Sequence, residues 1–119
     1  MLNLDTHILV RAVEGDLTPA ESLELGRQRW GISAIVLWEI AKLAQLGRIA
    51  ISLDTPELVQ LLRHVHVWPI DLEVCRALAQ LDFRSDPADE LIAATSIVHQ
   101  VPLLTRDRTL RRSRRVPLA

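Results

Sequence analysis

The sequence contains very little cysteine and few aromatic residues. Cys75 is its only cysteine among 119 residues, which excludes an internal disulfide and a Cys-x-x-Cys metal site. Tyrosine is absent, and phenylalanine occurs once, at Phe83. We expect Trp30, Trp38 and Trp68 to pack inside the protein, so the composition argues against an aromatic surface that stacks single-stranded bases.

Long apolar runs are also absent, although hydrophobic residues make up 49% of the chain. No run approaches the roughly 20 residues needed to cross a bilayer. Met1 leads directly into a short strand-like segment, without the basic region that opens a secretory signal. The four histidines do not have the spacing of a zinc site. We therefore expect a cytoplasmic protein with no membrane contact, and the length predicts a single domain over 1–119.

The net charge of −1 hides an uneven distribution. Residues 106–119 contain six arginines and one acid, a charge of +5, whereas residues 1–105 carry −6. A basic end beside an acidic site suits a substrate that bears phosphate. The alternative is a solvated, partly frayed terminus, and charge alone does not separate the two.

Four carboxylates occupy positions where apolar or turn residues are usual. Asp5 closes the first apolar segment, Glu39 is the only charge between Arg29 and Lys42, Asp89 precedes an apolar helical run, and Asp107 follows a Leu-rich segment. Burying several acids together is costly because each raises the pKa of the others. A divalent cation would offset that cost.

Each of these acids also has an ordinary structural explanation. Asp5 and Asp107 are both placed to cap helices, and Glu39 fits a narrow exposed stripe of a mostly apolar helix. Asp86 and Asp89 flank one helix start, where we assign Asp86 as the cap and Asp89 as the ligand. The set of four favours a hard cation, Mg²⁺ or Mn²⁺, because its ligands are all oxygen. Such a site predicts metal-assisted phosphodiester hydrolysis.

Turn and capping signals predict strands that alternate with helices. Strands are expected over 2–5, 31–33, 66–70 and 102–105, with a candidate edge strand over 116–118. Helices are expected over about 7–14 with Thr6 as cap, 18–30, after Ser33 to about 45, 55–64, 71 or 72 to about 81, from Asp86 onward, and 107–112. Short apolar strands between helices imply a parallel sheet covered on both faces. Ligands bind such sheets beyond the carboxyl ends of the strands.

Four short motifs occur in order across essentially the whole chain. They are Leu4-Asp5-Thr6; Ser33-Ala34 with Leu37-Trp38-Glu39-Ile40; Asp86-Pro87-Ala88-Asp89 with Leu91-Ile92-Ala93-Ala94-Thr95; and Pro102-Leu103-Leu104-Thr105-Arg106-Asp107. Together they resemble a PIN domain, and most closely the VapC-type toxin ribonucleases. The resemblance implies a three-layer α/β/α sandwich with a short, mostly parallel central sheet, in which Asp5, Glu39, Asp89 and Asp107 are catalytic and bind Mg²⁺ or Mn²⁺.

The resemblance further implies a metal-dependent endoribonuclease, the toxin of a type II toxin–antitoxin pair. RNA is then the substrate, a VapB-like antitoxin is the inhibitor, a homodimer is expected, and Thr6 and Thr105 support the acids. In two places the chain departs from the family pattern: Glu90 follows the third acid where arginine or lysine is usual, and the Arg-rich end is unusually basic.

Two other functions are consistent with the sequence. Glu90 leaves open a non-catalytic PIN-like module that binds RNA or protein. A phosphatase acting through an aspartyl phosphate would also use acids and a metal, but it needs a lysine near the phosphate. Lys42 is the only lysine and lies beyond Glu39 on the same predicted helix.

Overall fold

A four-stranded sheet in which all neighbouring strands are parallel forms the centre of the computed structural model, which describes residues 1–119. The strand order is β3-β2-β1-β4. Leu2 pairs with Trp30, and Asn3 pairs with Leu103. Strand β1, one of the two inner strands, is fully buried, as a parallel sheet covered on both faces requires. The strands are β1 (Leu2–Leu4), β2 (Trp30–Ser33), β3 (His66–Trp68) and β4 (Leu103–Leu104).

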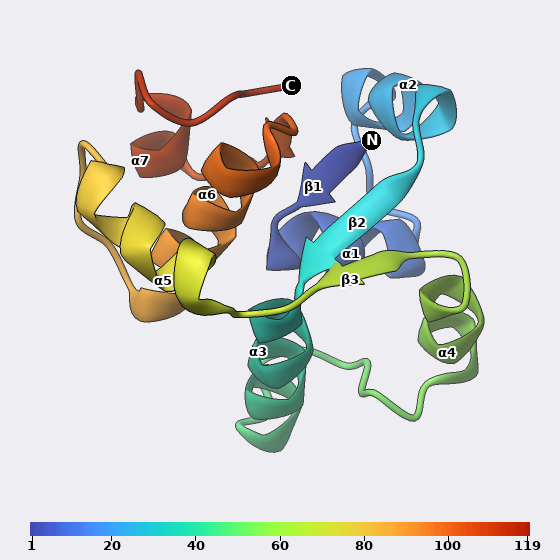
Figure 1. Ribbon diagram of the computed structural model, residues 1–119. Coiled ribbons are helices and arrows are strands. Elements are labelled where there is room, and N and C mark those ends of the chain that lie inside the picture. Colours follow the sequence, from blue (N-terminus) through green and yellow to red (C-terminus); the bar gives the residue numbers. More distant parts are fainter.

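Helices cover both faces of this sheet. Figure 1 shows α5, α6 and α7 on one side and α1, α2 and α4 on the other, with α3 projecting from the end where the strands finish. This arrangement confirms the predicted three-layer α/β/α class. The helices are α1 (Thr6–Glu14), α2 (Pro19–Arg27), α3 (Ala34–Gln45), α4 (Pro56–Leu62), α5 (Leu72–Ala77), the 3₁₀ turn η1 (Leu78–Gln80), α6 (Pro87–His99) and α7 (Arg108–Arg111).

The capping signals place most helix starts correctly. Thr18 and Glu21 form the predicted capping box of α2: the Glu21 amide donates to the Thr18 hydroxyl, and the Thr18 amide donates to the Glu21 carboxylate. Asp86 is the cap residue of α6 by position, as predicted. Gly47, with φ of +70°, follows α3 in the left-handed conformation that glycine adopts without strain.

Several predicted boundaries were wrong, and the strand expected over 66–70 ends at Trp68. Asp5, not Thr6, caps α1, because its carboxylate accepts the Thr6 amide at 2.8 Å. Helix α2 ends at Arg27 rather than near residue 30: Trp30 begins β2, and its indole N–H bonds the carbonyl of Leu25. The helix expected to run to about 81 changes to η1 after Ala77.

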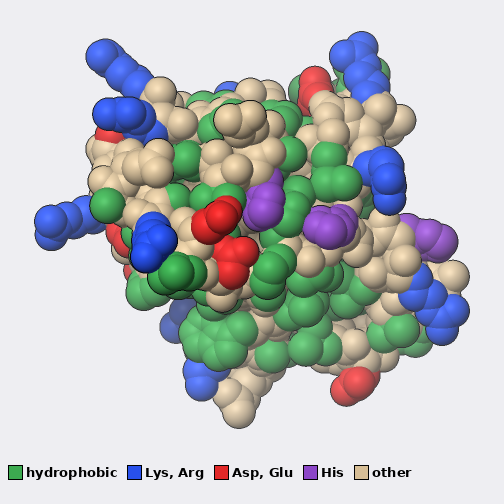
Figure 2. All heavy atoms as spheres, in the orientation of Figure 1, with side chains coloured by type: hydrophobic (Ala, Val, Ile, Leu, Met, Phe, Trp, Pro, Cys, Tyr) green, Lys and Arg blue, Asp and Glu red, His purple; other side chains and the backbone are tan.

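Helix α3 is less buried than its apolar sequence predicts. Only Val36 and Ile40 are buried in it, and Trp38 is 58% exposed, so the expectation that all three tryptophans pack inside was wrong. The reason is that α3 extends past the end of the sheet, where only one of its faces meets other elements. Figure 2 shows hydrophobic side chains gathered over the lower part of the same view, around α3.

The C-terminal segment is anchored, which contradicts the frayed-terminus alternative. The Leu103 amide donates to the carbonyl of Pro117, and the Ala119 amide donates back to Leu103, both at 2.9 Å. Val116 is 5% exposed. The expected edge strand is reduced to one parallel bridge between Leu103 and Leu118. None of the helices has the length and apolar character needed to span a membrane.

Candidate functional site

The four predicted acids come from four different elements that meet near the carboxyl ends of β1 and β4. Asp5 directly follows β1, and Asp107 follows β4 by three residues. Glu39 lies in α3, the helix that β2 leads into through its cap Ser33. Asp89 lies in the first turn of α6, which packs across β1 and β2. The crevice rule for parallel sheets therefore places these residues at one end of the molecule.

Asp5 is the most buried of the four, at 4% exposed. Its two carboxylate oxygens are divided between partners: Oδ1 accepts the Thr6 amide at 2.8 Å, and Oδ2 accepts the Thr105 hydroxyl at 2.6 Å. Burial raises the pKa of Asp5, the two hydrogen bonds and His7 oppose that rise, and the charge of Glu39 adds to it. Neither hydrogen-bond donor carries a charge, so the negative charge of Asp5 is not neutralised by them.

Glu39 is connected to Asp5 through Thr6. The buried Thr6 hydroxyl donates to Oε1 of Glu39, and the Thr6 amide donates to Asp5. One residue therefore fixes the relative positions of two acids from different elements. The prediction that Thr6 and Thr105 support the acids agrees with these contacts.

Asp89 repeats this pattern on the opposite side of the site. Its Oδ2 accepts the Ser85 hydroxyl at 2.8 Å. Burial is the main cause that raises the pKa of Asp89, and the charges of Asp5, Asp107 and Asp86 raise it further. The charges of two other predicted ligands, Asp5 and Asp107, therefore oppose ionisation of Asp89.

Glu90, the residue after Asp89, makes a local contact at the start of α6. Its Oε2 accepts the backbone N–H of Ser85 at 2.8 Å, which makes it a cap for the start of α6. Glu90 follows the third acid where the family pattern has arginine or lysine, and its carboxylate is bonded to the backbone of the loop before α6.

Asp107 also has a structural role. Its Oδ1 accepts the amide of Leu110, so it caps the four-residue helix α7, as one of its two sequence explanations anticipated. The Thr105 hydroxyl accepts the Asp107 amide at 3.0 Å and donates to Asp5. Thr105 thereby connects two of the predicted ligands, and the second oxygen of Asp107 has no hydrogen bond.

The donor set suits a hard divalent cation, although it is not preassembled. Carboxylates and hydroxyls are the ligands that Mg²⁺ and Mn²⁺ prefer, and the four predicted acids offer oxygen alone. No three acidic, histidine or cysteine side chains lie close enough together to form a ready group of metal ligands.

Sequence reasoning missed several polar residues that build this end of the molecule. Ser85 holds Asp89, yet in the sequence it looks like an ordinary loop residue before a helix. Asn3 is fully buried, and its amide donates to the carbonyl of Ile92 and to Ser96, which ties β1 to α6. A polar residue in the middle of an apolar strand is the signal that could have revealed it.

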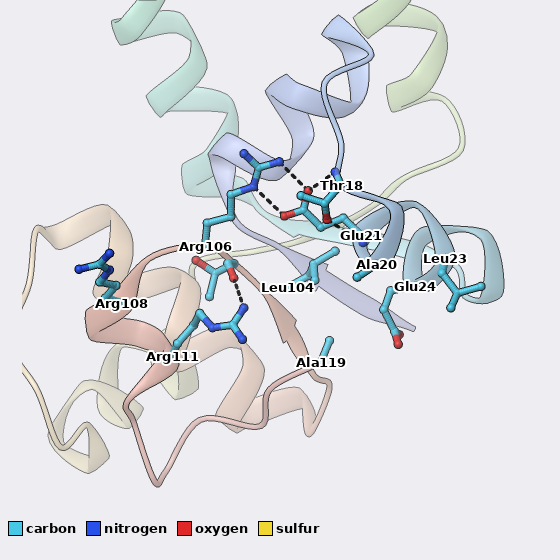
Figure 3. A pocket seen from close by; sticks show the side chains of 11 residues that line it. Thr18, Ala20, Glu21, Leu23, Glu24, Leu104, Arg106, Arg108, Arg111 and Ala119 are labelled. Carbon is cyan, nitrogen blue, oxygen red and sulfur yellow. Dashed lines mark hydrogen bonds and ion pairs between the residues drawn. The ribbon is translucent and has the colours of Figure 1, made fainter.

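Glu21 and Arg106 form a second missed pair, beside the acids. Arg106 Nε and Nη2 bond the two oxygens of Glu21 at 2.7 and 2.6 Å, across 85 sequence positions. Figure 3 shows this pair at one side of a surface pocket of about 600 Å³, which Thr105, Arg108 and Arg111 also line. The hydrogen bonds from Arg106 lower the pKa of Glu21 to about 2.

Lysine chemistry is excluded from the site by position. Lys42 is exposed on α3, and its ammonium donates to Gln45 one turn further along the same helix. A lysine at the acids, which the phosphatase alternative requires, is not present.

Comparisons with known proteins agree with the fold. The PIN domain family model matches residues 3–116. The chain is 40% identical over 86 residues to ribonuclease VapC22 of Mycobacterium tuberculosis; the match covers 70% of this chain and 66%, just under two thirds, of that relative. Two solved structures are similar in fold: VapBC2 from Rickettsia felis bound to a promoter DNA fragment (TM-score 0.76, 21% identity, 100% of this chain and 98% of the other) and DNA-bound VapBC from Salmonella typhimurium (TM-score 0.72, 18% identity, 99% and 96%).

Proposed function

We infer the function of this chain from one established premise: it belongs to the PIN domain family. We propose that it is a metal-dependent endoribonuclease that hydrolyses phosphodiester bonds in RNA, and that it is the toxin of a type II toxin–antitoxin pair. The ribonuclease name of the 40%-identical relative and the VapBC fold neighbours support this proposal. The observation that carries it is Asp5, a carboxylate that is 4% exposed and has no cationic side chain among its hydrogen-bond partners.

In this proposal Asp5, Glu39, Asp89 and Asp107 hold Mg²⁺, and Mn²⁺ can substitute. The cation supplies an activated water and stabilises charge on a phosphoryl oxygen. The raised pKa values of Asp5 and Asp89 give a physical reason for a cation here, because a divalent charge relieves the repulsion that raises the pKa of Asp89.

The side chains around the acids set their orientation. The hydroxyls of Thr6, Thr105 and Ser85 each hold one carboxylate oxygen of Glu39, Asp5 and Asp89, respectively. Such outer contacts restrict rotation of the three carboxylates. The burial of Asp5, Thr6 and Thr105 keeps bulk water from the inner side of the site.

RNA binding is proposed to depend on arginine–phosphate contacts. Arg108, Arg112, Arg114 and Arg115 are exposed on and after α7, which begins directly after Asp107. Affinity that depends on phosphate contacts falls steeply with salt. Trp38, exposed and next to Glu39 in sequence, is the one large aromatic side chain available for stacking.

Two protein partners belong to the proposal. A VapB-like antitoxin would inhibit the enzyme, in line with the toxin–antitoxin complexes among the fold neighbours. A homodimer would cover part of the exposed apolar surface, which includes Trp38, Leu46 and Leu72 at 58%, 55% and 62% exposure. Light scattering on the isolated chain tests the proposed dimer. A cytoplasmic location is part of the proposal, because RNA is the proposed substrate.

A nuclease assay tests the proposed activity. We expect the chain to cleave RNA in Mg²⁺ or Mn²⁺ and to stop when EDTA removes the metal. The alternative function is a PIN-like module that binds RNA or protein without cutting, and the lack of a preassembled group of three ligands favours it. RNA that is bound but left intact at millimolar Mn²⁺ would establish that alternative.

A further inference from the structure

The segment Thr105–Asp107 carries one proposed ligand and the hydroxyl that holds another, yet regular structure gives it little support. Strand β4 has only two residues, and its hydrogen bonding to β1 ends where Leu104 accepts the Asp5 amide. Helix α7, which follows, has four residues, too few to be stable without other contacts. The position of this segment must therefore be fixed by side chains.

Arg106, the middle residue of the segment, has the strongest of these contacts. Its guanidinium makes a two-pronged contact with Glu21, with distances of 2.7 and 2.6 Å, and donates to the carbonyl of Asp16 at 3.2 Å. Two parallel bonds from a planar guanidinium to a carboxylate fix direction as well as distance. Figure 3 shows the Arg106 side chain reaching from the β4–α7 segment to α2.

Glu21 is a rigid anchor for this contact. It is 8% exposed, and the oxygen that binds Arg106 Nη2 also accepts the Thr18 amide in the capping box of α2. The carboxylate is thus fixed by the start of one helix while it holds a loop 85 residues away. The guanidinium of Arg106 is directed at Glu21, and no hydrogen bond joins it to Asp5 or Asp89.

We propose that the Glu21–Arg106 pair is a positioning clamp for the metal site. By holding Arg106 to α2, the pair fixes the two flanking residues, so that the Thr105 hydroxyl meets Asp5 and the Asp107 carboxylate faces the site. Arg106 acts through these neighbours and contacts neither the metal nor RNA. The inference rests on the proposed function for its consequence, but the clamp itself is testable without metal.

The first experiment measures backbone protection without metal. In Arg106→Gln we expect the amides of Asp107 and Leu110, which bond within the clamped segment, to exchange with deuterium about tenfold faster than in the wild type. Arg108→Gln is the matched control, since Arg108 is exposed in the same segment and has no side-chain bond. Equal exchange in Arg106→Gln and Arg108→Gln would overturn the clamp, whatever metal binding shows.

The second experiment measures Mn²⁺ affinity by calorimetry in the absence of RNA. We expect Arg106→Gln to bind Mn²⁺ about 10-fold more weakly, Arg106→Lys to recover part of the loss, and Arg108→Gln to match the wild type. In cleavage assays Arg106→Gln should lower kcat and leave KM for RNA within about twofold.

Several outcomes separate this inference from its alternatives. Unchanged Mn²⁺ affinity in a folded Arg106→Gln protein would reduce the pair to a stabilising contact and overturn the positioning role. A raised KM with a flatter salt dependence would make Arg106 an RNA contact, which also overturns it. A wild-type protein that binds no Mn²⁺ would overturn the proposed function, and the exchange experiment would still decide the clamp.

Discussion

Asp5 and Glu21 are buried to almost the same extent, 4% and 8% exposed, but their surroundings affect them in opposite ways. Arg106 binds both oxygens of Glu21 and lowers its pKa to about 2. Asp5 receives one hydroxyl and one amide, and its pKa is raised, mainly by burial. Burial is common to both acids; only Glu21 has a cation among its hydrogen-bond partners.

This difference separates an acid that stabilises the fold from the acids that we propose as metal ligands. A buried carboxylate paired with a cation is stabilised, whereas an unpaired one costs free energy. Glu21 is stabilised within the chain, while Asp5, Asp89 and their neighbours repel one another. A cation from outside the chain would supply the positive charge that Arg106 supplies to Glu21.

The largest effect is expected from Asp5→Asn. We predict that cleavage falls by more than about 100-fold, because one metal ligand is lost. The metal-free protein should be as stable as the wild type or more stable. Because the pKa of Asp5 is raised in the folded state, its ionisation lowers the stability of the folded protein as pH rises from the unfolded to the folded pKa value. Asparagine carries no charge and avoids this loss. Cleavage rates and metal-free melting curves measure both effects.

Full activity in Asp5→Asn would show that Asp5 is not a required metal ligand, and the proposed functional difference between Asp5 and Glu21 would be wrong. A large loss of metal-free stability would also contradict it, because the charge of Asp5 would then have been compensated after all.

Next in size is the effect of the exposed arginines. We predict that the combined change of Arg112, Arg114 and Arg115 to Gln weakens RNA binding and flattens its salt dependence by about one unit of slope for each lost phosphate contact. Shortening the chain is a poorer experiment, since Leu103 bonds Pro117 and Ala119. An unchanged slope of affinity against salt would show that these arginines do not contact RNA phosphates.

A smaller effect on stability is expected from Glu21→Gln. Glutamine can keep the bond from the Thr18 amide but loses the ion pair, so we predict a melting temperature lower by about 5 °C. Arg106 is partly exposed, and solvent screening limits the loss. Glu24→Gln, on the same helix but without a hydrogen bond to Arg106, is the matched control. A melting temperature equal to that of the control would show that Glu21 is no better compensated than Asp5.

The smallest effect concerns pH. The pKa of Glu21 is lowered from 4.5 to about 2, so its contribution to stability is complete above pH 4.5 and is lost as pH falls toward 2. In this range the unfolded state binds more protons than the folded state. The wild type should therefore lose stability on acidification more steeply than Glu21→Gln in denaturation experiments. Parallel curves would contradict the lowered pKa.

Local signals in the sequence predict much of this fold. Thr18, Pro19 and Glu21 mark the start of α2 because a capping box depends only on neighbours. The apolar strands and the helices between them predict the parallel sheet and its carboxyl edge. Boundaries that depend on distant partners were missed, such as Trp30, which pairs with Leu2 instead of extending α2.

The candidate site was predictable only in part, because local sequence shows the acids but not their partners from distant segments. Its four acids stand out because they interrupt apolar segments. Their supporting partners do not: Ser85 and Arg106 are ordinary surface residues in the sequence, and only folding brings Arg106 to Glu21. The exposure of Trp38 was missed because an apolar helix sequence does not reveal how far the helix extends beyond the sheet.

The most direct test of the proposed metal site is the change in melting temperature that Mn²⁺ causes. It is measured in the wild type, Asp5→Asn and Asp54→Asn. Asp54 is exposed and far in sequence from the four acids. Mn²⁺ at ten times its Kd should stabilise the wild type and Asp54→Asn by about 1.4 kcal/mol and leave Asp5→Asn nearly unchanged. A wild type that Mn²⁺ does not stabilise, or an equal shift in all three proteins, would contradict the account.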